Sequence, residues 1–329
     1  MKRLIFLAFW AVVLAGCSSS SIEPKTEVQP VPFSDDNSLA LNIANQTYLR
    51  QPYTWGLDTY QSPLKDFTEE EIKAIETSLE NNRGDASYVA SAISLATGNL
   101  MGATIHFAGG SLEKLVTSDH IASRAGWIIA VDSSLYKDGV AANTAANKLI
   151  EDAVLRTLKD KGNILTNVVL QEEGTATFGG KIYGRTGYVI GEDKKTSFGL
   201  VSDDYQNKNG MKLGKTNLID ADSQYVTIWN TPSLGLGSIY LFHDNKVQGY
   251  EGVEGYEQYV KDVTAKLPKG FYFYLPSFPQ SGYRVVENIE DWACSTCGKK
   301  FSYRMLNIHV PAIYTQGKKY EFIKPQMQD

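Results

Sequence analysis

Apolar side chains recur at helical spacing through the first half of the chain, and each apolar run follows a residue that can cap a helix. Thr68 and Glu71 have the spacing of a capping box, in which each side chain accepts a hydrogen bond from the backbone N–H of the other residue. The pattern predicts helices over Asp35–Tyr48 behind Ser34, Glu69–Asn82 behind Thr68, Asp85–Ala96, and Asp138–Lys161 ahead of Gly162. The apolar side of the last helix is expected to comprise Leu149, Ala153, Leu155 and Leu158.

After Gly162 the pattern changes to the alternation that is typical of half-buried strands. Fourteen of the nineteen tyrosines lie beyond residue 180, which favours strands because aromatic side chains suit sheet surfaces. One helix is expected here, over Glu254–Lys266 and ended by Pro268. The expected strands are Ile164–Leu170, parts of Thr175–Ile190, Tyr225–Trp229, Ser238–Phe242, Phe271–Leu275, Tyr283–Val286 and Met305–Val310.

Helices followed by strands predict an α+β fold, with an N-terminal mainly helical part followed by a mainly antiparallel β part. We expect the helical domain to cover residues 34–162 and the β domain to cover residues 163–329. Residues 1–16 and 17–33 differ from both in composition and are interpreted separately.

Residues 1–16 have the pattern of a secretory signal peptide. Lys2 and Arg3 precede an uncharged apolar run that ends at Ala15, and this run is shorter than the roughly 20 residues that span a bilayer. The sequence Leu-Ala-Gly-Cys closes the segment at residues 14–17. These four residues resemble the lipobox of bacterial lipoproteins.

The resemblance implies that Cys17 becomes the first residue of the mature protein and carries the lipid. Its thiol would receive a diacylglyceryl group, and its amino group an acyl chain such as palmitate. Two or more chains anchor a protein stably, whereas one chain binds a membrane only marginally. Ser18 stands where inner-membrane lipoproteins of enterobacteria-like species have aspartate, so the resemblance implies the outer membrane, with the body expected in the periplasm.

Residues 17–33 are expected to form a disordered tether behind the lipidated cysteine. Ser18–Pro32 is polar, contains three prolines and has few large apolar side chains. Such a segment cannot bury enough surface to offset its chain entropy.

The 329-residue chain has a formal net charge of −5, which becomes −7 when Lys2 and Arg3 leave with the signal peptide. Nucleic-acid binding needs a basic face, so this balance argues against nucleic acid as a partner. The expected partners are membrane lipid, through acylated Cys17, and other envelope proteins.

Cys294 and Cys297 form a close pair that has three interpretations. The first is a structural disulfide that closes a tight turn, which an exported location permits. The second is a redox site, because a CxxC at the start of a helix can lower the pKa of one thiol. The third is a zinc site with His309, but a structural zinc ion needs four ligands and no second histidine follows. We favour the disulfide.

Ala86–Leu112 contains no charged residue if His106 is neutral, and Gly98 and Gly102 have GxxxG spacing. One interpretation is a membrane-inserting or oligomerising hairpin. The other is a pair of small-residue helices in a soluble core, which we favour because the stretch breaks near Gly98 into pieces too short to span a bilayer.

No set of catalytic residues emerges from the motifs. Ser111 and Lys114 match SxxK, but the companion motifs of penicillin-binding proteins are absent. The pairs Asp220/Asp222 and Asp203/Asp204 lie in turn-like sequence, where carboxylates are common. We therefore predict no catalytic residue, no cofactor and no metal.

These observations favour a non-enzymatic, lipid-anchored accessory or assembly component of the outer membrane or of a surface machine. The alternative is an envelope enzyme or glycan-binding protein that acts on peptidoglycan or polysaccharide, with tyrosines of the β part as stacking surfaces.

Overall fold

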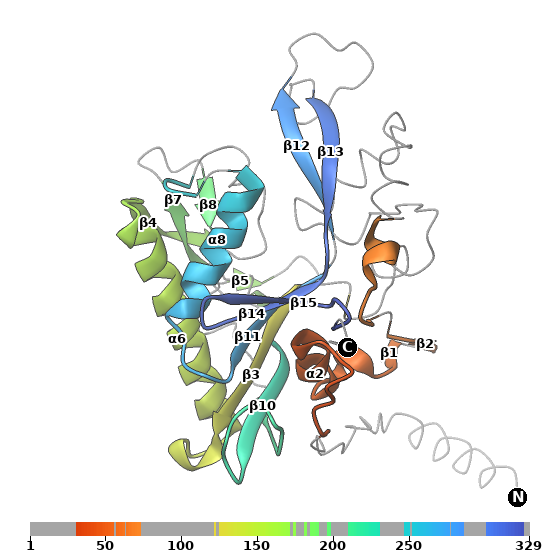
Figure 1. Cartoon of the computed structure of the whole chain (residues 1–329). Coiled ribbons are helices and arrows are strands. Elements are labelled where there is room, and N and C mark those ends of the chain that lie inside the picture. Colours follow the sequence, from red (N-terminus) through yellow and green to blue (C-terminus); the bar gives the residue numbers. More distant parts are fainter. Residues whose placement is uncertain are drawn as a thin grey trace, which may run out of the picture.

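The computed structural model describes residues 31–55, 57–62, 64–73, 122, 125–171, 174–175, 181–182, 185–190, 196–198, 210–230, 247–250, 252–276, 278–285 and 301–325. Its centre is a six-stranded sheet in the order β15-β14-β11-β3-β10-β9, in which all neighbours are antiparallel (Figure 1). These strands are β15 (Lys318–Glu321), β14 (Ala312–Thr315), β11 (Phe271–Leu275), β3 (Gly126–Asp132), β10 (Gln224–Asn230) and β9 (Lys212–Gly214). The helices around the sheet are α2 (Leu39–Asn45), α6 (Gly139–Asp160) and α8 (Gly252–Ala265), with the 3-10 turns η1 (Tyr48–Arg50) and η4 (Ser133–Leu135).

Strand β3 occupies an interior position of the sheet, although only helices were expected in that part of the chain. Six of its seven residues are buried, so both of its faces are covered and its sequence does not alternate between apolar and polar residues. A short apolar run of this kind does not distinguish a buried strand from a helix. The same reason applies to β14, whose four residues are all buried.

Helices α6 and α8 pack together over one face of the sheet. Phe273 of β11 stands opposite Trp127 of β3 and Tyr314 of β14, so the three residues share this face. The Trp127 and Phe273 ring centroids are 5.1 Å apart. Lys319 stands opposite Tyr314 and its Nζ lies 3.1 Å from a carboxylate oxygen of Glu257 on α8, which places α8 on the same face.

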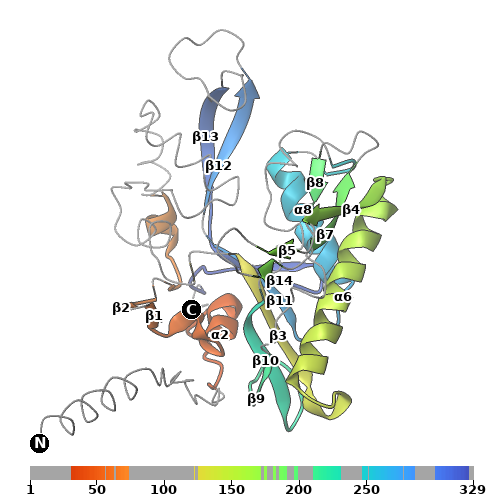
Figure 2. The ribbon, with the colours of Figure 1, turned by 180° about the vertical axis from the view of Figure 1, so that it is seen from behind.

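Helix α2 lies against the opposite face, away from α6 and α8 (Figure 2). Tyr272 of β11 points to this face and donates a hydrogen bond to the Leu218 carbonyl (2.8 Å). The adjacent backbone N–H of Asn217 donates to Gln46 Oε1, at the end of α2 (3.2 Å). Both faces of the sheet are therefore buried, which explains why its central strands are apolar throughout.

Helix α6 confirms the longest predicted helix at both ends. Asp138 caps it by accepting a hydrogen bond from the Ala141 N–H (2.8 Å), and Gly162 follows it with a φ of 85°. The apolar side was predicted only in part. Ala153 and Leu158 are fully buried, whereas Leu149 and Leu155 are only partly buried beside a stripe formed by Ala142, Ala146, Ile150 and Val154.

Of the two other predicted helix starts that the structure describes before α6, the one at Thr68 is confirmed and the one at Ser34 is wrong. Thr68 and Glu71 form the predicted capping box, with N–H to side-chain oxygen distances of 3.0 and 3.2 Å, and the helix is described over residues 69–73. Helix α2 is shorter than predicted and is capped by Ser38 instead of Ser34. The reason is that Asn42 holds the backbone of Ser34 in a two-way hydrogen bond, which keeps that residue outside the helix.

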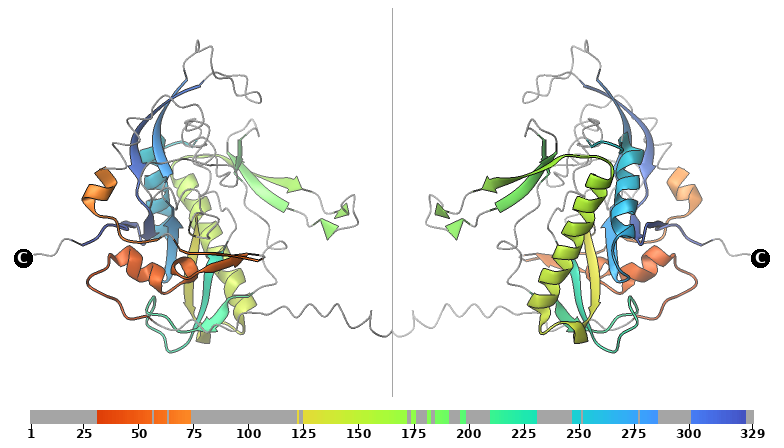
Figure 3. Two further views of the ribbon diagram at one scale, coloured as in Figure 1. Left: turned by 90° about the vertical axis from the view of Figure 1, so that its right-hand side faces the viewer. Right: turned by 90° about the vertical axis from the view of Figure 1, so that its left-hand side faces the viewer.

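The remaining strands form smaller sheets. The sheet β4-β7-β8 follows α6 and stands out from the body (Figure 3). The predicted strands Tyr283–Val286 and Met305–Val310 correspond to the last residues of two longer strands, β12 and β13, which end at Val285 and His309. The strands are β1 (Tyr53–Trp55), β2 (Asp58–Tyr60), β4 (Leu165–Gln171), β5 (Gly174–Thr175), β6 (Lys181–Ile182), β7 (Arg185–Ile190), β8 (Thr196–Phe198), β12 (Phe278–Val285) and β13 (Phe301–His309).

The architecture confirms the α+β class. The boundary at residue 162 stays a prediction, and the sheet takes strand β3 from before that residue and its other five strands from after it. The expected helix Asp85–Ala96, the uncharged stretch Ala86–Leu112 and the strand Ser238–Phe242 lie outside the described residues.

Candidate functional site

The three predicted site residues, Cys17, Cys294 and Cys297, lie outside the described residues, so their lipidation and disulfide stay predictions. The cysteine pair belongs to the connection between β12 and β13. The geometry of these two strands is therefore the structural setting of the pair.

Strands β12 and β13 form a two-stranded arm that leaves the body (Figure 1). Its first pair is Phe278 opposite His309, and the ladder behind it in the main sheet ends with Leu275 opposite Ala312. The arm thus continues strands β11 and β14 beyond the core. The eight residues of β12 extend about 27 Å at roughly 3.4 Å per residue.

Each strand of the arm pairs only with the other among the described residues. The outer edges therefore carry rows of backbone N–H and C=O groups, apart from Pro279, which has no N–H. Edges of this kind bind extended segments of other chains by strand addition. The arm is the candidate binding element of the body.

The tether joins the body at Val31, where Gln46 and Asn217 bind the backbone by hydrogen bonds. Its N–H donates to Gln46 Oε1 (3.3 Å), and its carbonyl accepts hydrogen bonds from Gln46 Nε2 and from Asn217 Nδ2 (2.8 Å). Gln46 is buried and also accepts the Asn217 N–H. Sequence reasoning missed this clamp, because no local pattern links residues that lie 171 positions apart.

The tether and the arm leave from opposite ends of the sheet. Gln224, the first residue of β10, stands opposite Asp132 at the end of β3, and its side chain bonds Thr216 just before the clamp residue Asn217. At the other end of β3, Gly126 stands opposite Tyr274, the last residue of β11 but one. Figures 1 and 2 show the arm rising from that second end.

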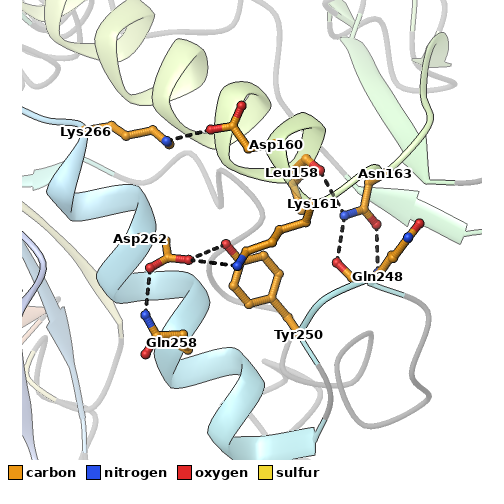
Figure 4. Close-up of polar contacts among 9 residues, drawn as sticks. All are labelled: Leu158, Asp160, Lys161, Asn163, Gln248, Tyr250, Gln258, Asp262 and Lys266. Carbon is orange, nitrogen blue, oxygen red and sulfur yellow. Dashed lines mark hydrogen bonds and ion pairs between the residues drawn. The ribbon is translucent and has the colours of Figure 1, made fainter.

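A polar cluster joins the ends of α6 and α8 (Figure 4). Asp262 accepts hydrogen bonds from the Tyr250 hydroxyl and from Gln258 Nε2, both at 2.7 Å, and Lys161 Nζ lies 3.9 Å away. Burial, and then the hydrogen bond to Asp262, raise the pKa of Tyr250 well above its usual value. The hydroxyl therefore stays protonated and acts as a donor, which fits a structural contact and not acid–base chemistry.

Asn163 fastens the same region to residues 247–250. Its Nδ2 donates to the carbonyls of Leu158 and Gln248, both at 3.0 Å, and its Oδ1 accepts the Gln248 N–H (2.9 Å). Gly162 and Gly249 flank this contact with positive φ angles of 85° and 79°. Both segments therefore turn sharply where Asn163 joins them.

The tyrosines of the central sheet and of α8 are mainly core residues. The fully or almost fully buried ones are Tyr256, Tyr259, Tyr272, Tyr274 and Tyr314, together with Tyr250 just before α8, whereas Tyr225 and Tyr320 of the sheet are partly buried. Burial raises the pKa of Tyr272 to about 12 and that of Tyr274 well above its usual value. Their rings are not available to stack on a sugar, and this weighs against the glycan-binding alternative for this part of the surface.

No group of three or more metal-ligating side chains occurs among the described residues, and no described helix is long and apolar enough to cross a membrane. Asp220 and Asp222 are both exposed, so they do not form an acid–base pair in a cavity. An open hollow of about 520 Å³ runs along the first turns of α6. The carboxylate that lines it belongs to Asp138, and this carboxylate caps the helix by accepting the Ala141 N–H.

Residues 1–18 match the family described as prokaryotic membrane lipoprotein lipid attachment site. This match confirms the lipobox and makes the chain a membrane-anchored lipoprotein. No curated protein and no solved structure matches the chain.

Proposed function

We propose that this lipid-anchored envelope protein is a non-enzymatic assembly component, which holds the β12–β13 arm away from its membrane for another envelope protein to bind. The proposal places the anchor in the outer membrane, because Ser18 follows the cysteine. It assigns the body to the periplasm and Cys294 and Cys297 to a disulfide in the turn of the arm.

The observation that carries the proposal is the position of the arm. It continues two strands of the core and leaves the sheet at the end opposite the tether clamp at Val31. A ribbon continuous with a buried sheet has a fixed direction, and its free edges suit binding to an extended segment.

The enzyme or glycan-binding alternative has less support. The ionisable groups of the polar cluster are used in contacts between helices, and Tyr272, Tyr274 and Tyr314 of the central sheet are buried. The hollow along α6 has one carboxylate, from Asp138, which caps the helix, so this hollow lacks the pair of carboxylates that glycoside hydrolysis uses.

The test is photo-crosslinking in native membranes at single positions. Tyr283 and Tyr303 stand opposite each other in the arm, and Thr144 is an exposed residue on α6. Replacing each in turn with a photoreactive residue is expected to give the same covalent adduct with an envelope protein from both arm positions and none from Thr144. Adducts from Thr144 alone would contradict the assignment of the arm.

Binding to isolated peptidoglycan distinguishes the alternative. The lipoprotein is expected to stay in the supernatant when peptidoglycan sacculi are sedimented. Co-sedimentation with sacculi, or release of soluble fragments from them, would favour the enzyme or glycan-binding function instead.

A further inference from the structure

We propose that the apolar surface beside the tether lies on the bilayer into which the lipid anchor inserts. We call this surface the tether face and define it by Val31, Phe33, Leu39 and Leu57. The proposal depends on the lipoprotein signal and not on the binding role of the arm.

The tether face consists of exposed apolar side chains from the first part of the body. Large apolar side chains are exposed at eight described positions, and four of these belong to the tether face. The exposed fractions are 39% for Val31, 45% for Phe33, 40% for Leu39 and 102% for Leu57. Single exposed apolar residues are common, but four of them within residues 31–57, the first part of the body after the tether, favour a contact with the lipid.

Three of these residues are brought together by α2. Leu39, Asn42 and Gln46 are spaced three and four positions apart, so they follow one side of the helix. Gln46 holds the backbone of Val31, and Asn42 holds that of Ser34. Residues 31–34 therefore run along the side of α2 that carries Leu39.

The fourth residue lies in the turn of the β1–β2 hairpin. Trp55 stands opposite Asp58, so Leu57 is at the tip, where its side chain is fully exposed. In Figures 1 and 2 the hairpin projects away from α6 and α8. Three of its eight residues, 53–60, are aromatic, and Trp and Tyr are enriched at membrane interfaces.

The tether keeps this surface close to the membrane. Cys17 and Val31 are fourteen positions apart, which limits their separation to about 50 Å when the chain is fully extended. A flexible chain of this length has an average span of roughly 20 Å. Linkage at this distance gives an effective concentration in the millimolar range, so even a weak apolar contact with the bilayer is populated.

Charge on this part of the chain determines which headgroups suit it. Residues 31–62 carry Asp35, Asp36 and Asp58 against one basic residue, Arg50. Anionic lipid therefore repels the surface, and the apolar side chains supply the attraction. The proposed ligand is a zwitterionic lipid surface.

The test uses the mature, lipidated chain in vesicles of phosphatidylethanolamine and phosphatidylcholine. An environment-sensitive fluorophore is attached to Leu57→Cys in a Cys294→Ser, Cys297→Ser background. The matched control is Ile164→Cys, which is 53% exposed between α6 and β4, on the far side of the sheet. Quenchers carried by lipids near the headgroups are expected to quench the Leu57 probe several-fold more than the control probe. Equal quenching at the two positions would overturn the proposal.

A second measurement retains the natural cysteines. Energy transfer from the protein's tryptophans to dansyl-labelled lipid is expected to fall in the double variant Phe33→Glu, Leu57→Glu and to stay unchanged in Ile164→Glu. Phosphatidylglycerol in the vesicles is expected to lower the transfer of the natural protein. Unchanged transfer in the double variant, or a rise with phosphatidylglycerol, would overturn the proposal. The crosslinking test of the arm is unaffected by either result.

Discussion

Buried amide side chains connect segments of this protein that regular structure does not join. Gln46 holds the start of the body against Asn217, and Gln224 closes the loop behind it by donating to the carbonyls of Thr216 and Ile219. Asn163 joins the end of α6 to Gln248. An amide suits this role because it donates and accepts at once and carries no charge to desolvate.

Replacing Asn163 with alanine tests this role. The change removes three hydrogen bonds of a buried side chain, and the backbone carbonyl and N–H of Gln248 lose this partner. We expect the free energy of unfolding to fall by about 2 kcal/mol. Urea unfolding of the unlipidated chain from Ser18 onward measures this. The exposed Asn167→Ala is the control, with an expected change within about 0.5 kcal/mol. Equal losses in the two variants would contradict the role.

The capping box of Thr68 and Glu71 starts a helix through local hydrogen bonds, and its Glu71 carboxylate also carries a charge. A hydrogen bond from Lys65, and then one from the Thr68 backbone, lower the pKa of Glu71 below its usual value. A carboxyl group whose pKa is lower in the folded state stabilises the fold above its unfolded pKa of about 4.5. The contribution is lost as the pH falls through the folded value.

A double-mutant cycle with Lys65→Met and Glu71→Gln tests this linkage. Both side chains are more than one-third exposed, and solvent screening therefore limits the expected coupling free energy to about 0.5 kcal/mol at pH 7. The coupling should decrease as the pH is lowered from 4.5, since protonated Glu71 no longer attracts Lys65. Thermal unfolding at several pH values measures it. A coupling that stays constant down to pH 3 would show that the charge of Glu71 plays no part.

In the molecule as a whole, the sheet separates the start of the body from the start of the arm. The clamp at Val31 fixes where the tether leaves, and the continuation of β11 and β14 fixes where the arm leaves. Because a twisted sheet with both faces buried is stiff, the core sets the direction of the arm relative to the clamp at Val31.

The choice between outer and inner membrane can be tested in a cell. In an enterobacterial host, Ser18→Asp is expected to move the protein from the outer to the inner membrane fraction on a density gradient, because aspartate at this position resembles the inner-membrane retention signal. Ser20→Asp serves as the control and should leave the distribution unchanged. The outer-membrane assignment would be wrong if the unmodified protein sedimented with the inner membrane.

Local elements of the fold were largely predictable. Asp138, Gly162 and the pair Thr68 and Glu71 act through neighbours a few residues away, and their positions were correctly predicted. Ser34 failed as a cap because Asn42, eight positions along, binds its backbone. For the candidate sites, the sequence indicated a turn with Cys294 and Cys297 but not the arm, since the arm depends on pairing between residues 16 to 31 positions apart, from Val285 opposite Phe301 to Phe278 opposite His309.

The lipobox, the acidic charge balance and most helix and strand positions could be predicted from the chain alone, because each depends on composition or on contacts within a few residues. The interior position of β3, the clamp between Val31, Gln46 and Asn217, the burial of most tyrosines of the central sheet, and the placement of tether and arm at opposite ends follow only from the folded structure. These features depend on hydrogen bonds and packing between residues far apart in the chain, which leave no periodic signal along it.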